Sequence, residues 1–367
     1  MTAVRGLRLA YRQHLASRLI VHLIGMIFLS ACAAHTPEYR DNANVRLMIH
    51  DSVPGDWRDA VASIQEISPL HVSPELRDFI NSTARSNATP RDRVFALARS
   101  IIDPDDGIGL SYDPGATYSA SEAFASRTAN CLGFSNLLVA SARELGLDAS
   151  YELVSHRLRW EKTDGALIGT LHVRVASHVG ASKFVLDFYP LPLESGYSTQ
   201  EISDDTALAH HMNNLAVTSM QGNDHAQAYA LIYKAIETSP NVAFIWSNLG
   251  ILLSRQGLDV FAEMAFDEAL SIDPGSLSTL SNLQRLYTEQ GRNEEARALS
   301  AVLDDYREQN PYYHFWLGEQ AYELGEYRAA VEHLKKAIKL NANEREFFLL
   351  LSKSYNNLGL DKAASRA

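Results

Sequence analysis

The last third of the chain repeats every 34 residues, and this period constrains the fold more than any other feature. Five blocks begin at residues 209, 243, 277, 311 and 345 and keep one register without an insertion. Ala stands at the twentieth position of every block, and Gly at the fifteenth position of four. Small residues let two helices approach closely, and Gly makes the turn between them. The period therefore predicts stacked helix pairs, each in contact with its neighbours.

The second block carries the fullest set of marker residues: Trp246, Leu249, Gly250, Ala262, Phe266, Ala269 and Pro274. This pattern resembles the tetratricopeptide repeat, or TPR. The resemblance implies an all-α TPR solenoid over residues 205–367, about 4.5 repeats, with the truncated fifth block as its cap. It also implies a groove that binds a peptide or protein partner and has no catalytic chemistry of its own. The alternative is a generic helical bundle with accidental spacing.

The first 31 residues predict a secretory signal. Residues 1–18 carry four arginines and no acid, and an apolar run follows at residues 19–31. That run is shorter than the roughly 20 apolar residues that a membrane-spanning helix needs. Residues 29–32, Leu-Ser-Ala-Cys, resemble the lipobox of bacterial lipoproteins.

The lipobox resemblance implies a mature chain that begins at a lipid-modified Cys32, with residues 32–44 as a polar tether. Ala33, rather than Asp, implies the outer membrane, facing the periplasm. We therefore expect a lipid-anchored protein of the bacterial cell envelope.

Composition excludes several kinds of partner and site. The net charge of −11 gives no overall attraction to nucleic acid, which we do not expect as a partner. The chain has two cysteines, too few for a disulfide scaffold or a Cys-based zinc site. We expect neither a metal nor a cofactor.

The middle of the chain, residues 45–195, predicts one α+β domain of ordinary size. Helical patterns come first, around residues 74–80, 89–102 and 131–145, and alternating strand patterns follow at 151–154, 171–176 and 183–189. A polar stretch at residues 191–206 predicts the linker into the repeats.

Cys131 is expected at the start of a helix, where the unpaired N–H groups and the helix dipole favour a nucleophilic thiolate. The alternatives are an inert buried cysteine or a disulfide to Cys32. Residues 117–149 resemble the nucleophile segment of the transglutaminase-like superfamily. The resemblance implies a papain-like Cys-His-Asp site, with Cys131 as nucleophile, His172 as general acid and base, and Asp187 orienting the imidazole.

The alternation of the strands supports the last two assignments independently. His172 and Asp187 each lie opposite to the apolar phase of their strand. A hairpin centred on residues 179–180 would place the two side chains directly opposite each other, about 5 Å apart between Cβ atoms. A register shifted by two would still leave both on one face. The alternative for His172 is a strand histidine that faces solvent.

Two functions compete. In the first, Cys131 attacks an amide or peptide carbonyl, and water or an amine resolves the acyl-enzyme, as in a peptidase, an amidase or a transglutaminase. In the second, the chain is a non-catalytic scaffold lipoprotein that binds partners through its repeats and a degenerate transglutaminase-like module.

Overall fold

The structure is a computed structural model, and it describes residues 43–83, 89–155, 161–163, 166–168, 171–188 and 198–366. The predicted signal peptide, the predicted acylation site Cys32 and nearly all of the predicted tether lie outside these residues. Among the described helices, none has the length and apolar character needed to span a bilayer.

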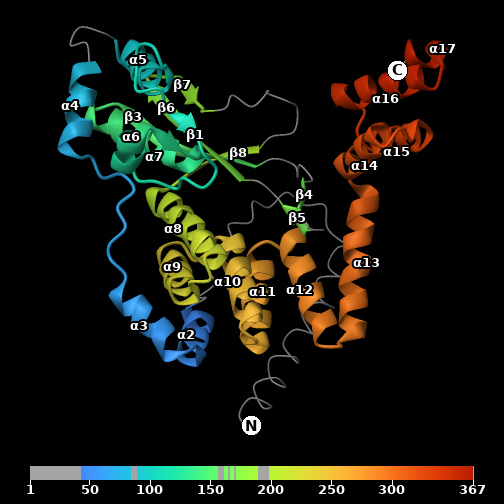
Figure 1. Cartoon of the computed structure of the whole chain (residues 1–367), viewed down its shortest axis with the longest axis horizontal. Helices are drawn as coiled ribbons and strands as arrows, with labels where there is room; N and C mark the ends of the chain where they lie inside the picture. The colour runs from blue at the N-terminus through green and yellow to red at the C-terminus, as the bar shows by residue number, and fades with distance from the viewer. Residues whose placement is uncertain are drawn as a thin grey trace. The chain divides into compact units, whose positions relative to one another are not determined.

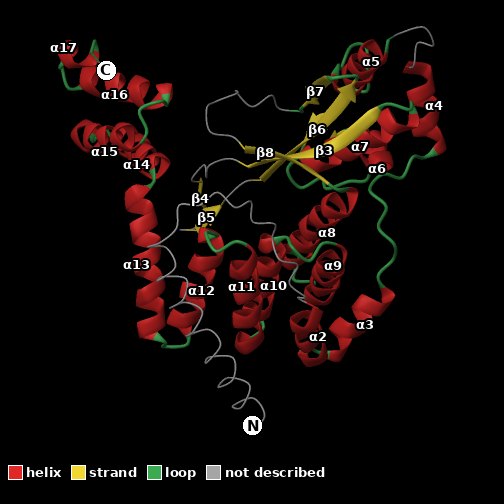
Figure 2. Ribbon diagram, turned by 180° about the vertical axis from the view of Figure 1, so that it is seen from behind, coloured by secondary structure: helices red, strands yellow, loops and turns green. Residues whose placement is uncertain are grey.

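An α+β region follows two N-terminal helices (Figure 1). Its helices are α4 (Pro74–Thr83), α5 (Pro90–Ile102), α6 (Ala120–Ser126) and α7 (Cys131–Glu144). Its strands are β1 (Ser111–Tyr112), β2 (Thr128–Ala129), β3 (Asp148–Ser155), β4 (Glu161–Thr163), β5 (Ala166–Ile168), β6 (Leu171–Val179), β7 (Ser182–Leu186) and β8 (Ser198–Ile202). The main sheet has the antiparallel order β7-β6-β3-β8 (Figure 2).

Helix α7 and the sheet share the core of this region. The apolar run of α7, including Phe134, Leu137 and Leu138, is almost fully buried and clusters with Val173 and Val175 of β6. Period-2 alternation then turns the neighbouring residues of β6, His172 and Arg174, away from this core. The apolar alternation of β6 thus places His172 and Arg174 on the face of the sheet opposite to this core.

The β6–β7 hairpin has a register two residues different from the predicted one. His178 pairs with Lys183 and Val179 with Ser182, so the turn is Gly180-Ala181 and not Val179-Gly180. Gly180 has a φ of +60°, a conformation that glycine adopts without strain. The direct opposition of His172 and Asp187 is therefore wrong, because Asp187 follows the last ladder pair, Val175 with Leu186. Both side chains still meet on one face.

The helical repeats occupy the rest of the chain (Figure 1). Their helices are α8 (Asp204–Gln221), α9 (His225–Thr238), α10 (Ala243–Arg255), α11 (Asp259–Ile272), α12 (Leu277–Glu289), α13 (Asn293–Gln309), α14 (Pro311–Glu323), α15 (Tyr327–Leu340), α16 (Arg345–Asn357) and α17 (Asp361–Ala364). Four of these helices begin at the first residue of a 34-residue block. The repeats form the expected helical solenoid of pairs.

Close helix approach explains the small residues of the repeats. A Cβ added to Gly250 of α10 would lie 2.5 Å from the ring of Phe266 on α11, so no larger residue fits without displacement. Gly257 serves the turn instead, since its φ is +69° and nothing crowds it. Glycine therefore has two roles within one repeat: it allows close helix packing at Gly250 and a left-handed turn at Gly257.

Helices α2 (Ala43–Ser52) and α3 (Gly55–Ser63) pack on the repeats and not on the sheet. Their buried residues Ile49, Val53, Trp57 and Val61 join one core with α8 to α13. The Trp57 ring lies 5.2 Å from that of Tyr229 on α9. The prediction of an α+β domain from residue 45 did not foresee this packing. The α+β region is thus flanked in sequence by segments of one helical core.

Candidate functional site

Cys131 is the first residue of α7, as its sequence context predicted. Asn130 caps the helix: its side-chain oxygen accepts from the Gly133 N–H at 2.9 Å, and its amide donates to Thr117 Oγ1 at 2.7 Å. Gly133 allows the loop around Ala116 to lie close to the first turn of α7, since a Cβ on Gly133 would be 3.1 Å from Ala116 O. The thiol therefore stands at a tightly held helix start.

Ser135 joins the first turn of α7 to the sheet. Its hydroxyl lies 2.9 Å from the carbonyl of Cys131 and 3.3 Å from that of Val173. Val173 is the neighbour of His172 on β6, so this contact brings the first turn of α7, which carries Cys131, next to the strand of the histidine.

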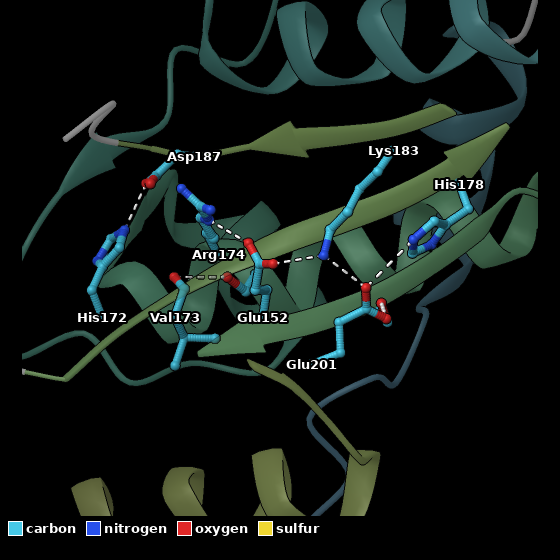
Figure 3. Close-up of polar contacts among 10 residues, drawn as sticks. Glu152, His172, Val173, Arg174, His178, Lys183, Asp187 and Glu201 are labelled. Carbon is cyan, nitrogen blue, oxygen red and sulfur yellow. Dashed lines mark hydrogen bonds and ion pairs between the residues drawn. The ribbon is translucent and has the colours of Figure 1, made fainter. Parts of the chain in front are cut away.

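His172 and Asp187 form a hydrogen-bonded pair. Nε2 of His172 lies 2.8 Å from Oδ1 of Asp187, and their side chains are 12% and 8% exposed (Figure 3). Burial disfavours the charged imidazole, but interactions with Asp187 and with Cys131 outweigh it and raise the pKa of His172 to about 9. Since Nε2 is engaged by Asp187, Nδ1 is the nitrogen left to face the thiol. All three predicted residues thus converge.

A ladder of charged side chains continues from this pair along the same face of the sheet (Figure 3). Glu152 is only 1% exposed and accepts from Arg174 Nε at 2.6 Å and from Lys183 Nζ at 2.7 Å. Lys183 also donates to Glu201 at 2.8 Å. Burial opposes the ionisation of Glu152, yet these two cations lower its pKa. The ladder crosses all four strands and was not foreseen from the sequence.

A second polar cluster joins α7 to the repeats. The Tyr151 hydroxyl donates to Asn136 Oδ1 at 2.8 Å, and Asn136 Nδ2 donates to Tyr118 O at 2.9 Å. The same nitrogen lies 3.2 Å from Nδ1 of His211 on α8. We call these four residues the Asn136 cluster. Nothing in the sequence marks His211 as a partner of Asn136, because a polar residue on an apolar helix face does not show which residue it contacts.

Burial explains the protonation state of the two histidines on α8, His210 and His211. Desolvation lowers the pKa of both His210 and His211 to about 4, so both rings are neutral near pH 7. Within the described ranges, no group of His, Cys, Asp and Glu side chains is arranged to hold a metal ion.

Comparison with known proteins identifies the repeats. A family model, the tetratricopeptide repeat, matches residues 311–344, the fourth block. No curated protein matches the chain. The chain therefore contains TPR repeats, which are typical of protein–protein interaction.

Several solved structures are similar over part of the chain. MamA from Desulfovibrio magneticus RS-1 is 15% identical, over 45% of this chain and 91% of that one, with a TM-score of 0.27. PilF from Pseudomonas aeruginosa is 20% identical, over 45% and 75%, with a TM-score of 0.28. The APC/C hetero-tetramer Cut9-Hcn1 is 16% identical, over 43% and 32%, with a TM-score of 0.26.

Proposed function

We propose that the chain is a lipid-anchored thiol enzyme of the transglutaminase-like superfamily that acts on a peptide or protein amide while its TPR repeats bind a protein. One observation carries the catalytic part: the buried hydrogen bond of 2.8 Å between His172 and Asp187, beside the thiol at the start of α7. The sequence of residues 1–32 supports the lipid anchor on Cys32 and an envelope location facing the periplasm.

The proposed chemistry assigns one role to each residue. The Cys131 thiolate attacks the amide carbonyl, and the helix start offers the backbone N–H of Cys131 to the developing oxyanion. His172 gives a proton to the leaving amine and later takes one from the acceptor, which is water or an amine. Asp187 holds the imidazole through Nε2, so Nδ1 handles the proton. The Asn130 amide serves the helix cap, and we assign it no catalytic role.

A non-catalytic scaffold is the second candidate. The family-model match concerns the repeats, so the comparisons favour binding over catalysis. In this function the repeats recruit a partner, and the α+β region serves only as a degenerate interaction module. Its Cys131 would then be an ordinary thiol.

Alkylation kinetics separate the two candidates. The full chain is treated with iodoacetamide from about pH 6 to pH 9, and labelling is followed by mass spectrometry of the tryptic peptide 128–143, which contains Cys131. An imidazolium beside the thiol makes it reactive at the acid end of this range. We expect His172→Ala to slow alkylation at about pH 6 by roughly tenfold or more. Equal rates in both proteins at every pH would exclude the thiol enzyme and leave the scaffold.

A further inference from the structure

A cleft of about 770 Å³ lies where three segments meet. One wall is the segment 64–68 that leaves α3, the second is the loop 117–119 with the first turn of α6, and the third is α8 with α9. We call it the junction cleft. Boundaries between structural regions are common places for ligand sites, because several chain segments there offer polar groups to one space.

Residues 64–67 supply a polypeptide edge with unpaired backbone groups. Ile64 is extended, with φ of −63° and ψ of 128°, and residues 64–67 make no backbone hydrogen bond to any described residue. The side chains of Ile64 and Ile67 pack on the core of the repeats, which holds the segment in place. A fixed segment outside helix and sheet, extended at Ile64 and with unpaired N–H and C=O groups, is a template on which another chain can pair.

His211 supplies a buried donor on the opposite wall. The contacts of Asn136 settle its orientation: Oδ1 accepts from Tyr151, and Nδ2 donates to Tyr118 O. His211 Nδ1, 3.2 Å from that Nδ2, must then be the acceptor, and the ring proton sits on Nε2.

Nε2 of His211 finds no acceptor among the described residues. His211 is only 3% exposed. It nevertheless lines the cleft, and its Nε2 atom is not sealed off from that space. A neutral ring with a pKa of about 4 keeps this N–H across the physiological range. It is the kind of donor that a peptide carbonyl satisfies.

We propose that the junction cleft binds an extended segment of a partner polypeptide, which pairs with the backbone of residues 64–67 and places a carbonyl oxygen on His211 Nε2–H. The alternation of donors and acceptors along segment 64–67 selects a polypeptide over other ligands, since a strand presents the complementary alternation. None of the residues that line the junction cleft belongs to the helices from α10 onward, and binding there needs no reaction at Cys131.

A blocking substitution with a matched control tests the site. Thr218 and Gln221 are both exposed on α8, but only Thr218 lines the cleft. Random peptides of about eight residues, displayed on phage, are selected on the full chain, and enriched sequences are synthesised and titrated by calorimetry. We expect Thr218→Trp to weaken binding by about tenfold or more and Gln221→Trp to leave it within about twofold. Gln227→Trp, an exposed substitution on α9 that also lines the cleft, should repeat the loss.

Amide hydrogen exchange locates the bound peptide. The proposal requires the amides of residues 64–67 to become protected in the complex, because pairing removes them from water. Three results would overturn it: no peptide enriched above an unrelated control protein, unchanged affinity in both lining variants, or protection confined to α10 and α12.

Discussion

The repeats and the polar face of the sheet are held by different kinds of contact. In the repeats, apolar side chains join helices that are adjacent in sequence, and the same contact recurs: Gly250 faces Phe266, and Gly318 faces Leu334. On the polar face of the sheet, charged side chains join strands that are far apart in sequence. The first kind of contact depends on shape and repeats with the period, whereas the second depends on single residues and on one register.

The largest effect should come from the repeats. Trp246 is fully buried on α10, and its Nε1 donates to Pro240 O at 2.8 Å. Replacing it with alanine leaves a cavity and removes this hydrogen bond, so we expect Trp246→Ala to lower the free energy of unfolding by about 3–5 kcal/mol. Urea unfolding followed by circular dichroism measures the change.

Trp316 of α14 is the control for this substitution, because it is a tryptophan of the same helical array but only half-buried. Trp316→Ala should cost clearly less, since the loss follows the apolar area removed from water. Equal losses of unfolding free energy at the two positions would mean that the stabilisation by these tryptophans does not depend on how deeply they are buried.

The repeats could be predicted because their determinants are local. Block starts 243, 277, 311 and 345 coincide with the first residues of α10, α12, α14 and α16. Segment 43–63 escaped prediction for the opposite reason, since its partners on α9 lie more than 150 residues later and no period marks them. Strand β8 also escaped: its residues are mostly exposed and lack apolar alternation, so the stretch resembled a linker.

The next effect concerns the charged ladder of the sheet. Arg174 is the partner of the buried Glu152 across β3 and β6. Arg174→Met leaves Lys183 as the only cation that contacts Glu152 among the described residues. We expect a loss of about 2 kcal/mol in the free energy of unfolding, because a charged group in a buried place loses a hydrogen bond.

Lys183→Met is the matched change, and we expect it to cost less. The Lys183 side chain is 37% exposed, against 14% for Arg174, so water screens its attraction to Glu152 more strongly. If the lysine variant lost more stability than the arginine variant, the degree of burial would not determine how much each contact with Glu152 contributes to stability.

The candidate site was predictable in its residues but not in its geometry. Alternation alone placed His172 and Asp187 on one face, which survives a shift of register by two. Their exact pairing depends on the position of the turn. The turn lies at Gly180-Ala181, one residue later than predicted, and this changes which residues of β6 and β7 face each other. The Asn136 cluster could not be found at all, because Tyr118, Tyr151 and His211 carry no motif and meet only through tertiary packing.

The smallest effect should be the pH dependence of stability contributed by the His172–Asp187 pair. The pKa of His172 is raised from 6.5 to about 9, so the folded protein binds this proton more tightly than the unfolded chain does. The stabilisation is fully present below pH 6.5 and is lost as the pH rises through about 9. We expect a loss on the order of 1 kcal/mol, less than the full shift would give, because water screens a pair whose side chains are still 12% and 8% exposed. His210 and His211, whose pKa values are lowered to about 4, do not titrate in this window.

Urea midpoints measured at either side of that window, in the wild type and in Asp187→Asn, isolate this contribution. The asparagine keeps the size of the side chain but removes the charge that favours the imidazolium, so the variant should lose less stability between pH 6.5 and pH 9. The repeats, whose core is apolar, supply the baseline for the comparison, because Trp246→Ala should shift the midpoints at both pH values by the same amount. A wild type that became more stable as the pH rose would contradict the sign of the linkage. It would then follow that the pair of His172 and Asp187 does not hold a proton in the folded protein.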